Sequence, residues 1–165
     1  MTTSALKSLG TAALFALGMA SGMVRAEAIH FPAGKATFDA RCAVCHQAGG
    51  KGQDGLAPPL TAYPGHYAAS AQGRHQLPDT VLHGMYGEIH VADKTYNFKM
   101  PNFDSLSDDE LAQVLNYVVF DLNASSHGSA KPFTTAEIKA ARAKSMDAGA
   151  VYAQRTAVTK ALGLR

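Results

Sequence analysis

The clearest pattern of hydrophobic and polar positions in the chain lies between residues 107 and 123. Ser107 and Glu110 have the spacing of a capping box, in which two side chains satisfy backbone groups at the start of a helix. Apolar residues then recur at intervals of three and four, the period of one helix face. They are Leu111, Val114, Leu115, Val118, Val119 and Leu122. We therefore predict an amphipathic helix whose apolar stripe packs in the core.

Two earlier segments also show helical signals. Residues 31–47 place Phe38, Cys42 and Cys45 at spacings of four and three, which predicts a first helix. Residues 78–84 begin with proline and end with glycine, which predicts a short helix that starts after the proline. Both helices precede the capped helix described above.

The remaining regular structure is a small extended segment. Residues 87–97 predict a hairpin of two short strands, with its bend near Ala92 and Asp93. Because helices account for the other patterned segments, we expect an all-α fold class.

The end of the chain has a different composition. Residues 124–131 are rich in serine and glycine and predict a linker. Thr134 and Glu137 form a second capping box, which predicts a short helix over residues 135–148. Beyond Gly149 the chain is alanine-rich and basic. This tail is expected either to dock on a partner or to lie as a solvated surface helix.

The beginning of the chain predicts export. Residues 1–26 resemble a secretory signal peptide, with Lys7 before an apolar stretch and small residues at Val24 and Ala26 for cleavage. The alternative is an uncleaved anchor, but glycines interrupt the apolar stretch and it is shorter than the roughly 20 residues that span a bilayer. We expect three parts: a signal peptide (1–26), a domain (27–123) and a linker with a helical extension (124–165).

Composition and charge exclude some functions. The chain is 47% hydrophobic and 17% charged, which is ordinary for a globular protein. Lys and Arg number 15 against 13 Asp and Glu, and removing Lys7 and Arg25 of the leader makes the two counts equal. A mature chain of zero formal charge gives no support to nucleic-acid binding.

The two cysteines of the chain, Cys42 and Cys45, are followed directly by His46. Cys-x-x-Cys-His is typical of c-type haem attachment, in which both thiols form thioethers and the histidine ligates the iron. Two other chemistries share part of this pattern. A thioredoxin-like redox pair needs a βαβ context, which is not predicted here. A zinc site needs about four ligands, and the chain has no second cysteine pair.

The order of motifs around this site resembles class I cytochromes c, and especially the monohaem domains of bacterial dehydrogenase and oxidase subunits. The resemblance covers residues 34–143 and rests on Cys-x-x-Cys-His, Pro-Pro-Leu, Val-Leu-His-Gly, Met-Pro-x-Phe and the final capped helix. It departs from those domains at residues 120–123, where they often carry tryptophan. It implies three to five helices around one covalent haem c, with the hairpin and the helical tail added.

The resemblance also implies roles for individual residues. The Pro58 carbonyl would accept the second N–H of His46, and Leu60 would pack on the haem ring. Such an acceptor fixes the tautomer of a ligating histidine. Gly34 would let the first and last helices cross closely, although it is also compatible with a simple loop residue after Pro32.

Met100, which precedes a proline in a loop, is the expected second axial ligand, because methionine is one of the residues that ligate haem c. Met85 is the competing methionine. Four histidines are further alternatives: His66, His75, His83 and His90.

These expectations define a function. A haem with His46 and Met100 on its iron would carry electrons in the periplasm between redox partner proteins, a dehydrogenase on one side and an oxidase or another cytochrome on the other. It would not be an enzyme, and no membrane span would remain after signal cleavage. The alternatives are a cytochrome subunit held in a complex by its tail and a haem sensor or enzyme with an open sixth site.

Overall fold

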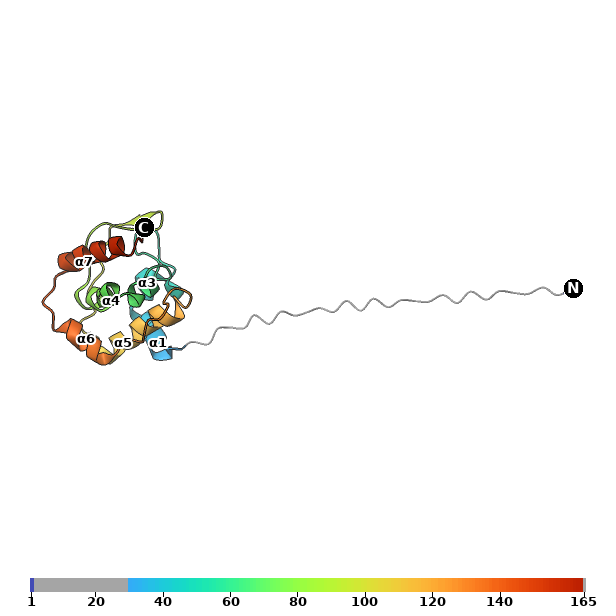
Figure 1. Ribbon diagram of the computed structural model, residues 1–165, viewed down its shortest axis with the longest axis horizontal. Helices are drawn as coiled ribbons and strands as arrows, with labels where there is room; N and C mark the ends of the chain where they lie inside the picture. The colour runs from blue at the N-terminus through green and yellow to red at the C-terminus, as the bar shows by residue number, and fades with distance from the viewer. Residues whose placement is uncertain (2–29, 165) are drawn as a thin grey trace.

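The computed structural model describes Met1 and residues 30–164, so the predicted signal peptide lies outside the described residues. Helices form most of the structure, as expected for the predicted all-α class, and they surround a central region (Figure 1). The elements are α1 (Pro32–Arg41), α2 (Ala43–His46), η1 (Ala48–Gly50), α3 (Pro64–Ala69), α4 (Ala71–His83), β1 (Ile89–Val91), β2 (Lys94–Tyr96), α5 (Asp108–Asn116), η2 (Tyr117–Asp121), α6 (Thr135–Arg142) and α7 (Ala148–Ala161).

The crossing of α1 and α5 forms the base of the fold. Gly34 is buried in α1, and a Cβ added to it would collide with the Gln113 carbonyl oxygen. One turn later the fully buried Phe38 packs its ring 5.4 Å from that of Tyr117. Gly34 is therefore a helix-crossing residue, as the resemblance implied, and the loop interpretation is wrong.

The last helix of this crossing begins where the sequence predicts. The Ser107 hydroxyl accepts a hydrogen bond from the Glu110 backbone, and the Glu110 carboxylate accepts one from the Ser107 backbone. The predicted apolar stripe is buried from Leu111 to Val119. At Tyr117 the helix widens into one π-helical turn, and Asp121 at its end accepts hydrogen bonds from the backbone of residues 30 and 31.

Two predicted helix boundaries are wrong. The single helix expected over 31–47 is divided at Cys42, between α1 and α2. The helix expected to start after Pro78 starts at Ala71, because the Ser70 hydroxyl caps it by accepting from the Gly73 N–H at 2.9 Å. Pro78 therefore lies inside α4. Packing of α4 against α3, α6 and α7 offsets the backbone hydrogen bond that a proline removes.

The predicted hairpin is present. β1 and β2 pair antiparallel, with Ile89 opposite Tyr96, and the bend falls at Ala92, whose φ is 55°. Ile89, Val91 and Tyr96 form a small apolar cluster separate from the main core, which we call the hairpin cluster. Tyr152 of α7 packs against it and donates a hydrogen bond to the Glu88 carbonyl at 2.9 Å.

The tail differs most from expectation. α6 starts at the predicted capping box but ends at Arg142 and not at 148, and Asp147 caps a separate helix, α7. α7 packs on α4 and buries Val151, Arg155 and Val158. One face of this helix thus belongs to the fold, which neither interpretation of the tail anticipated.

A buried carboxylate helps to hold the tail in place. Asp79 of α4 is fully buried and accepts hydrogen bonds from Lys144 Nζ at 2.8 and 2.9 Å and from Gln154 Nε2 at 3.0 Å. Because Lys144 precedes α7 and Gln154 lies within it, these bonds connect α4 to both.

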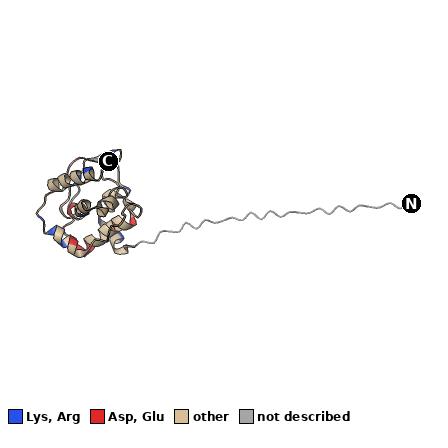
Figure 2. Cartoon of the chain, viewed as in Figure 1, with Lys and Arg blue, Asp and Glu red and all other residues tan. Residues whose placement is uncertain are grey.

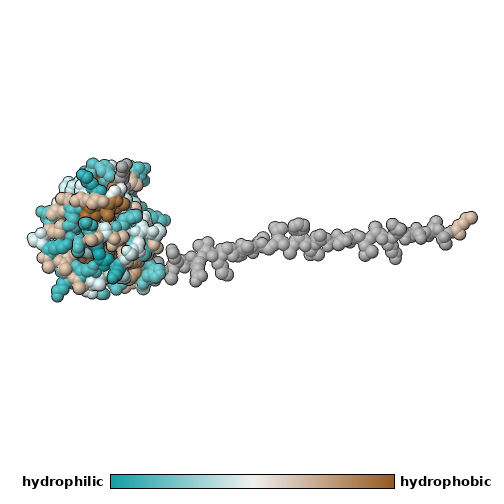
Figure 3. Space-filling view, viewed as in Figure 1, coloured by the Kyte–Doolittle hydropathy of each residue, from teal (hydrophilic) through white to brown (hydrophobic). Residues whose placement is uncertain are grey.

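Lys, Arg, Asp and Glu are spread over several helices in the view of Figure 2. On the face shown in Figure 3, the largest apolar patch lies beside α7 within mostly hydrophilic surface. Across the described residues, no helix combines the length and hydrophobicity that crossing a membrane requires.

Candidate functional site

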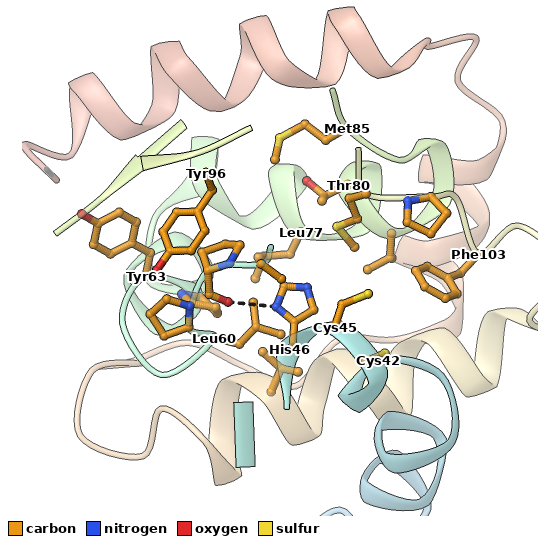
Figure 4. Close-up of a pocket in the computed structure, with 18 of the residues that line it drawn as sticks. Cys42, Cys45, His46, Leu60, Tyr63, Leu77, Thr80, Met85, Tyr96 and Phe103 are labelled. Carbon is orange, nitrogen blue, oxygen red and sulfur yellow. Dashed lines mark hydrogen bonds between the residues drawn. The ribbon is translucent and has the colours of Figure 1, made fainter. Parts of the chain in front are cut away.

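A deep pocket opens between α2, α4, α5 and α7, and its walls are mainly apolar. All six residues predicted for the site line it: Cys42, Cys45, His46, Pro58, Leu60 and Met100. Figure 4 shows Cys45 and Tyr63 on opposite sides of His46, so the cysteines mark one end of the pocket. Segments far apart in the sequence therefore assemble around one cavity.

His46 is oriented by a backbone carbonyl. It is buried at the end of α2, and its Nδ1 lies 2.9 Å from the Pro58 carbonyl oxygen (dashed line in Figure 4). A carbonyl can only accept, so Nδ1 carries the proton and the lone pair is on Nε2. Burial lowers the pKa of His46, against the smaller raising effect of the Pro58 carbonyl. The imidazole is thus held neutral, the form that ligates a metal.

The loop after His46 brings Pro58 to this position. The Gly52 N–H donates to the His46 carbonyl at 2.8 Å, and the Leu60 N–H donates to the Gly50 carbonyl at 2.7 Å. Gly52 has a φ of 75°, and a Cβ there would lie 2.5 Å from the Pro59 nitrogen. Glycine is therefore required where the two sides of the loop meet.

Cys42 does not have the lowered thiol pKa of a redox-active cysteine. Burial, together with the neighbouring Cys45, raises the pKa of the Cys42 thiol to about 11. A nucleophilic Cys-x-x-Cys thiol has a lowered pKa. Within residues 30–164, no group of three or more His, Cys, Asp or Glu side chains is arranged to hold a metal ion. Neither the thioredoxin-like nor the zinc interpretation is supported.

Met85 and Met100 both line the pocket and lie beside each other on neighbouring segments. The Met85 N–H donates to the Met100 carbonyl at 3.1 Å, and the Met100 N–H donates to the Met85 carbonyl at 2.9 Å. The Phe103 N–H donates to the Val81 carbonyl at 2.8 Å, so the loop is attached to α4 as well. The two methionines differ in surroundings, because the Met85 side chain packs against the hairpin cluster.

The four alternative histidines lie elsewhere. His66, His75 and His90 are exposed, and neither they nor His83 line the pocket. His83 is half-buried, and its Nε2 atom has no hydrogen-bond partner among the described residues.

Several pocket residues were missed by the sequence interpretation. Tyr63 and Tyr67 come from a segment with little pattern, and Gln76 from the part of α4 that was not predicted. Arg155 comes from the tail. One sequence signal could have found Arg155. Val151 and Val158 are seven residues apart, and this spacing places Arg155 on the buried face of α7.

The residues present fit a covalent haem c. Two thiols lie at one end of an apolar pocket, and a neutral imidazole with a free Nε2 lone pair lies beside them. Thioether formation removes the two thiols as titrating groups, and a flat macrocycle would occupy the apolar volume between α2 and α4.

Comparison with known proteins gives the family. Residues 31–119 match the family model for cytochrome c. The chain is 39% identical over 132 residues to cytochrome c-552 of Thermus thermophilus. The matched region covers 76% of this chain and 94% of that protein. A second cytochrome c-552 of the same species is also 39% identical over 132 residues and is covered over 83% of its length. The chain therefore belongs to the cytochrome c family, whose members carry covalent haem c as electron carriers and not as enzymes.

Proposed function

We propose that this cytochrome c is an exported, periplasmic one-electron carrier whose haem iron is bound by His46 and Met100. The observation that carries this proposal is the neutral His46 imidazole, oriented by Pro58 in an apolar pocket that Met100 also lines. When bound, the haem supplies one-electron exchange between ferric and ferrous iron.

Met100 is favoured over Met85 by what surrounds each residue. Met85 has apolar packing partners in the hairpin cluster, whereas Met100 lines the pocket without being part of either apolar cluster. The two hydrogen bonds to Met85 and the attachment at Phe103 hold the Met100 backbone in place. A ligand that is positioned before it binds the iron loses little conformational freedom on binding.

Leu60 and Pro58 have supporting roles. The Pro58 carbonyl keeps the imidazole in one tautomer, which also makes Nε2 more basic. Leu60 lines the pocket and packs against the main core, where its side chain can contact the face of the haem ring.

The exposed mouth of the pocket suits brief contact with other redox proteins. Val44, between the two cysteines, is 76% exposed and Phe98 is 61% exposed, and both line the pocket. Exposed apolar residues beside the haem edge can form the small interfaces typical of transient redox encounters. We infer a redox donor and a redox acceptor as partners.

The tail favours a free carrier over a subunit docked through residues 132–165. The buried apolar side chains of α7, Val151 and Val158, already pack within this fold. Ligation by His46 and Met100 would leave no open iron site for a substrate or gas. An electron carrier needs no such site.

Two measurements test the proposal. The mature holoprotein should appear in the periplasmic fraction of an expressing cell, and its ferrous form should not bind carbon monoxide rapidly at neutral pH. Rapid binding would show an open sixth position and would support a sensor or enzyme instead. Retention of the protein in the cytoplasm would contradict export.

A further inference from the structure

Arg155 is an unusual residue for the inside of a protein. It lies in the middle of α7, is only 8% exposed, and lines the haem pocket. Within residues 30–164, no hydrogen bond, ion pair or cation–π contact joins its guanidinium to another residue, and the Thr159 hydroxyl donates to its backbone carbonyl. A buried cation is costly unless it is paired, so a missing anion is implied.

The charges that line the pocket are of one sign. Arg41, Lys99 and Arg155 are its three charged residues, and none of the residues that line it is Asp or Glu. Arg41 and Lys99 are exposed and adjoin Cys42 and Met100 in the sequence, so water can solvate them. Arg155 is the buried member of the three, so the pairing of its charge depends on what the pocket contains.

The position of Arg155 follows from its neighbours. The Tyr67 hydroxyl donates to the Thr159 hydroxyl at 2.7 Å, one helical turn after Arg155. Burial raises the pKa of Tyr67, and the Arg155 charge opposes that rise. The ring of Tyr67 lies 6.2 Å from that of Tyr63, which is on the opposite side of His46 from Cys45 (Figure 4). Arg155 therefore belongs to the end of the pocket remote from the cysteines.

The chemistry of haem c places its anionic groups at that same end. Both thioethers form at the vinyl-bearing edge of the macrocycle, and the two propionates extend from the opposite edge. With the vinyl edge at Cys42 and Cys45, the propionates would extend toward the end of the pocket remote from the cysteines, where Tyr63 lies (Figure 4).

We propose that Arg155 pairs with a haem propionate, so that the C-terminal helix supplies a charge that tunes the reduction potential. Arginine presents several N–H donors in a planar fork that matches a carboxylate. A paired propionate contributes less negative potential at the iron, which favours the ferrous state. This inference rests on covalent haem attachment but not on which residue is the sixth ligand.

The test compares three variants of the full-length mature holoprotein in a spectroscopic redox titration. R155M keeps the length of the side chain and removes its charge, whereas R155K keeps a charge. K160M is the matched control, because it removes an exposed cation from the same helix. We expect R155M to lower the ferrous-to-ferric ratio at a fixed potential about tenfold, which corresponds to roughly 59 mV for one electron.

We expect R155K to lower the ferrous-to-ferric ratio less than R155M does. K160M should keep a ratio close to that of the wild type. An R155M ratio equal to that of K160M would overturn the proposal. The sulfur-to-iron absorption band of each ferric variant is recorded as well. Absence of that band in the wild type itself would count against Met100 as ligand, and would leave the comparison at Arg155 intact.

A measurement on the wild type covers the case in which R155M does not fold. In the diamagnetic ferrous protein, the δ-methylene protons of Arg155 should show a nuclear Overhauser contact with the propionate methylene protons. Absence of this contact in an assigned spectrum would overturn the pairing without any variant.

Discussion

The backbones of Met85 and Met100 are joined by a pair of hydrogen bonds of 3.1 and 2.9 Å, although fourteen residues separate them in the sequence. This short antiparallel bridge places two candidate ligands side by side at the same pocket. It also makes each the natural control for the other, because the two hydrogen bonds involve only backbone atoms and survive substitution of either side chain.

Replacing Met100 by alanine should remove the sixth iron ligand. We expect M100A to lose the weak sulfur-to-iron band of the ferric protein and to have a lower reduction potential, because a methionine ligand raises it. M85A should keep the band. Absorption spectra of both ferric variants decide the matter, and a band that persists in M100A but disappears in M85A would assign the ligand to Met85.

Gly84 allows the Met100 segment to approach α4. Its φ is 71°, and a Cβ there would lie 2.7 Å from the Met100 carbonyl oxygen. We expect G84A to lose about 3 kcal/mol of unfolding free energy, from backbone strain and from displacement of the methionine loop. Denaturant unfolding of the holoprotein measures this loss.

The control for that substitution is Gly49. It also has a positive φ, of 68°, but a Cβ added there would meet no atom within 4 Å. G49A should therefore cost only about 1 kcal/mol and leave the sulfur-to-iron band unchanged. Equal losses of unfolding free energy in G84A and G49A would show that crowding at Met100 contributes nothing to the cost of G84A.

Gly34 should tolerate no side chain. In G34A the new Cβ would collide with the Gln113 carbonyl and the Tyr117 side chain, so α1 and α5 must separate. We expect a loss of more than about 4 kcal/mol of stability, or no folded holoprotein. A36G, at an exposed position of α1, should cost only about 1 kcal/mol. A stable G34A protein would refute the close crossing.

Lys144 should stabilise the attachment of the tail. Removing its ammonium in K144M leaves the buried Asp79 carboxylate with Gln154 as its one remaining side-chain partner among the described residues. We expect a loss of about 2 kcal/mol in thermal or denaturant unfolding, since hydrogen bonds to charged groups contribute on this order. The double variant D79N/K144M should recover part of that loss, because it no longer buries an unpaired charge. If the double variant is as unstable as K144M, the charge of Asp79 is not the cause.

Glu137 should contribute to stability at neutral pH. Hydrogen bonding to the Arg74 guanidinium, and further bonds to Thr134, lower the pKa of its carboxyl from 4.5 to about 2. The folded state thus binds the proton less tightly than the unfolded state, so this contribution is complete above pH 4.5 and is lost between pH 4.5 and about 2. E137Q should be less stable than the wild type at pH 7, with the difference vanishing near pH 2.

The control for acid unfolding is the exposed Glu88. E88Q should follow the wild-type stability curve more closely than E137Q at every pH, while protonation of the haem ligands affects all three proteins alike. A difference between E137Q and the wild type that stays constant down to pH 2 would contradict the lowered pKa.

Much of the site was predictable because its signals are local. The haem motif lies within one turn of chain, so covalent attachment at Cys42 and Cys45 depends on neighbouring residues. Both capping boxes, at Ser107 and Thr134, are present where predicted, since each is formed by residues three positions apart. The crossing at Gly34 was predictable only through resemblance to a family.

Other features could not be predicted, because they depend on contacts between distant segments. Pro78 would end an isolated helix, but packing by neighbouring helices keeps α4 continuous through it. α7 has a weak apolar stripe, and its place on the pocket follows from bonds such as Gln76 to the Val151 carbonyl at 3.3 Å. The sequence by itself thus determined the cofactor and how it is attached. Tertiary structure decided that the tail contributes Arg155 to the pocket, since the burial of a side chain depends on the surfaces that fold against it.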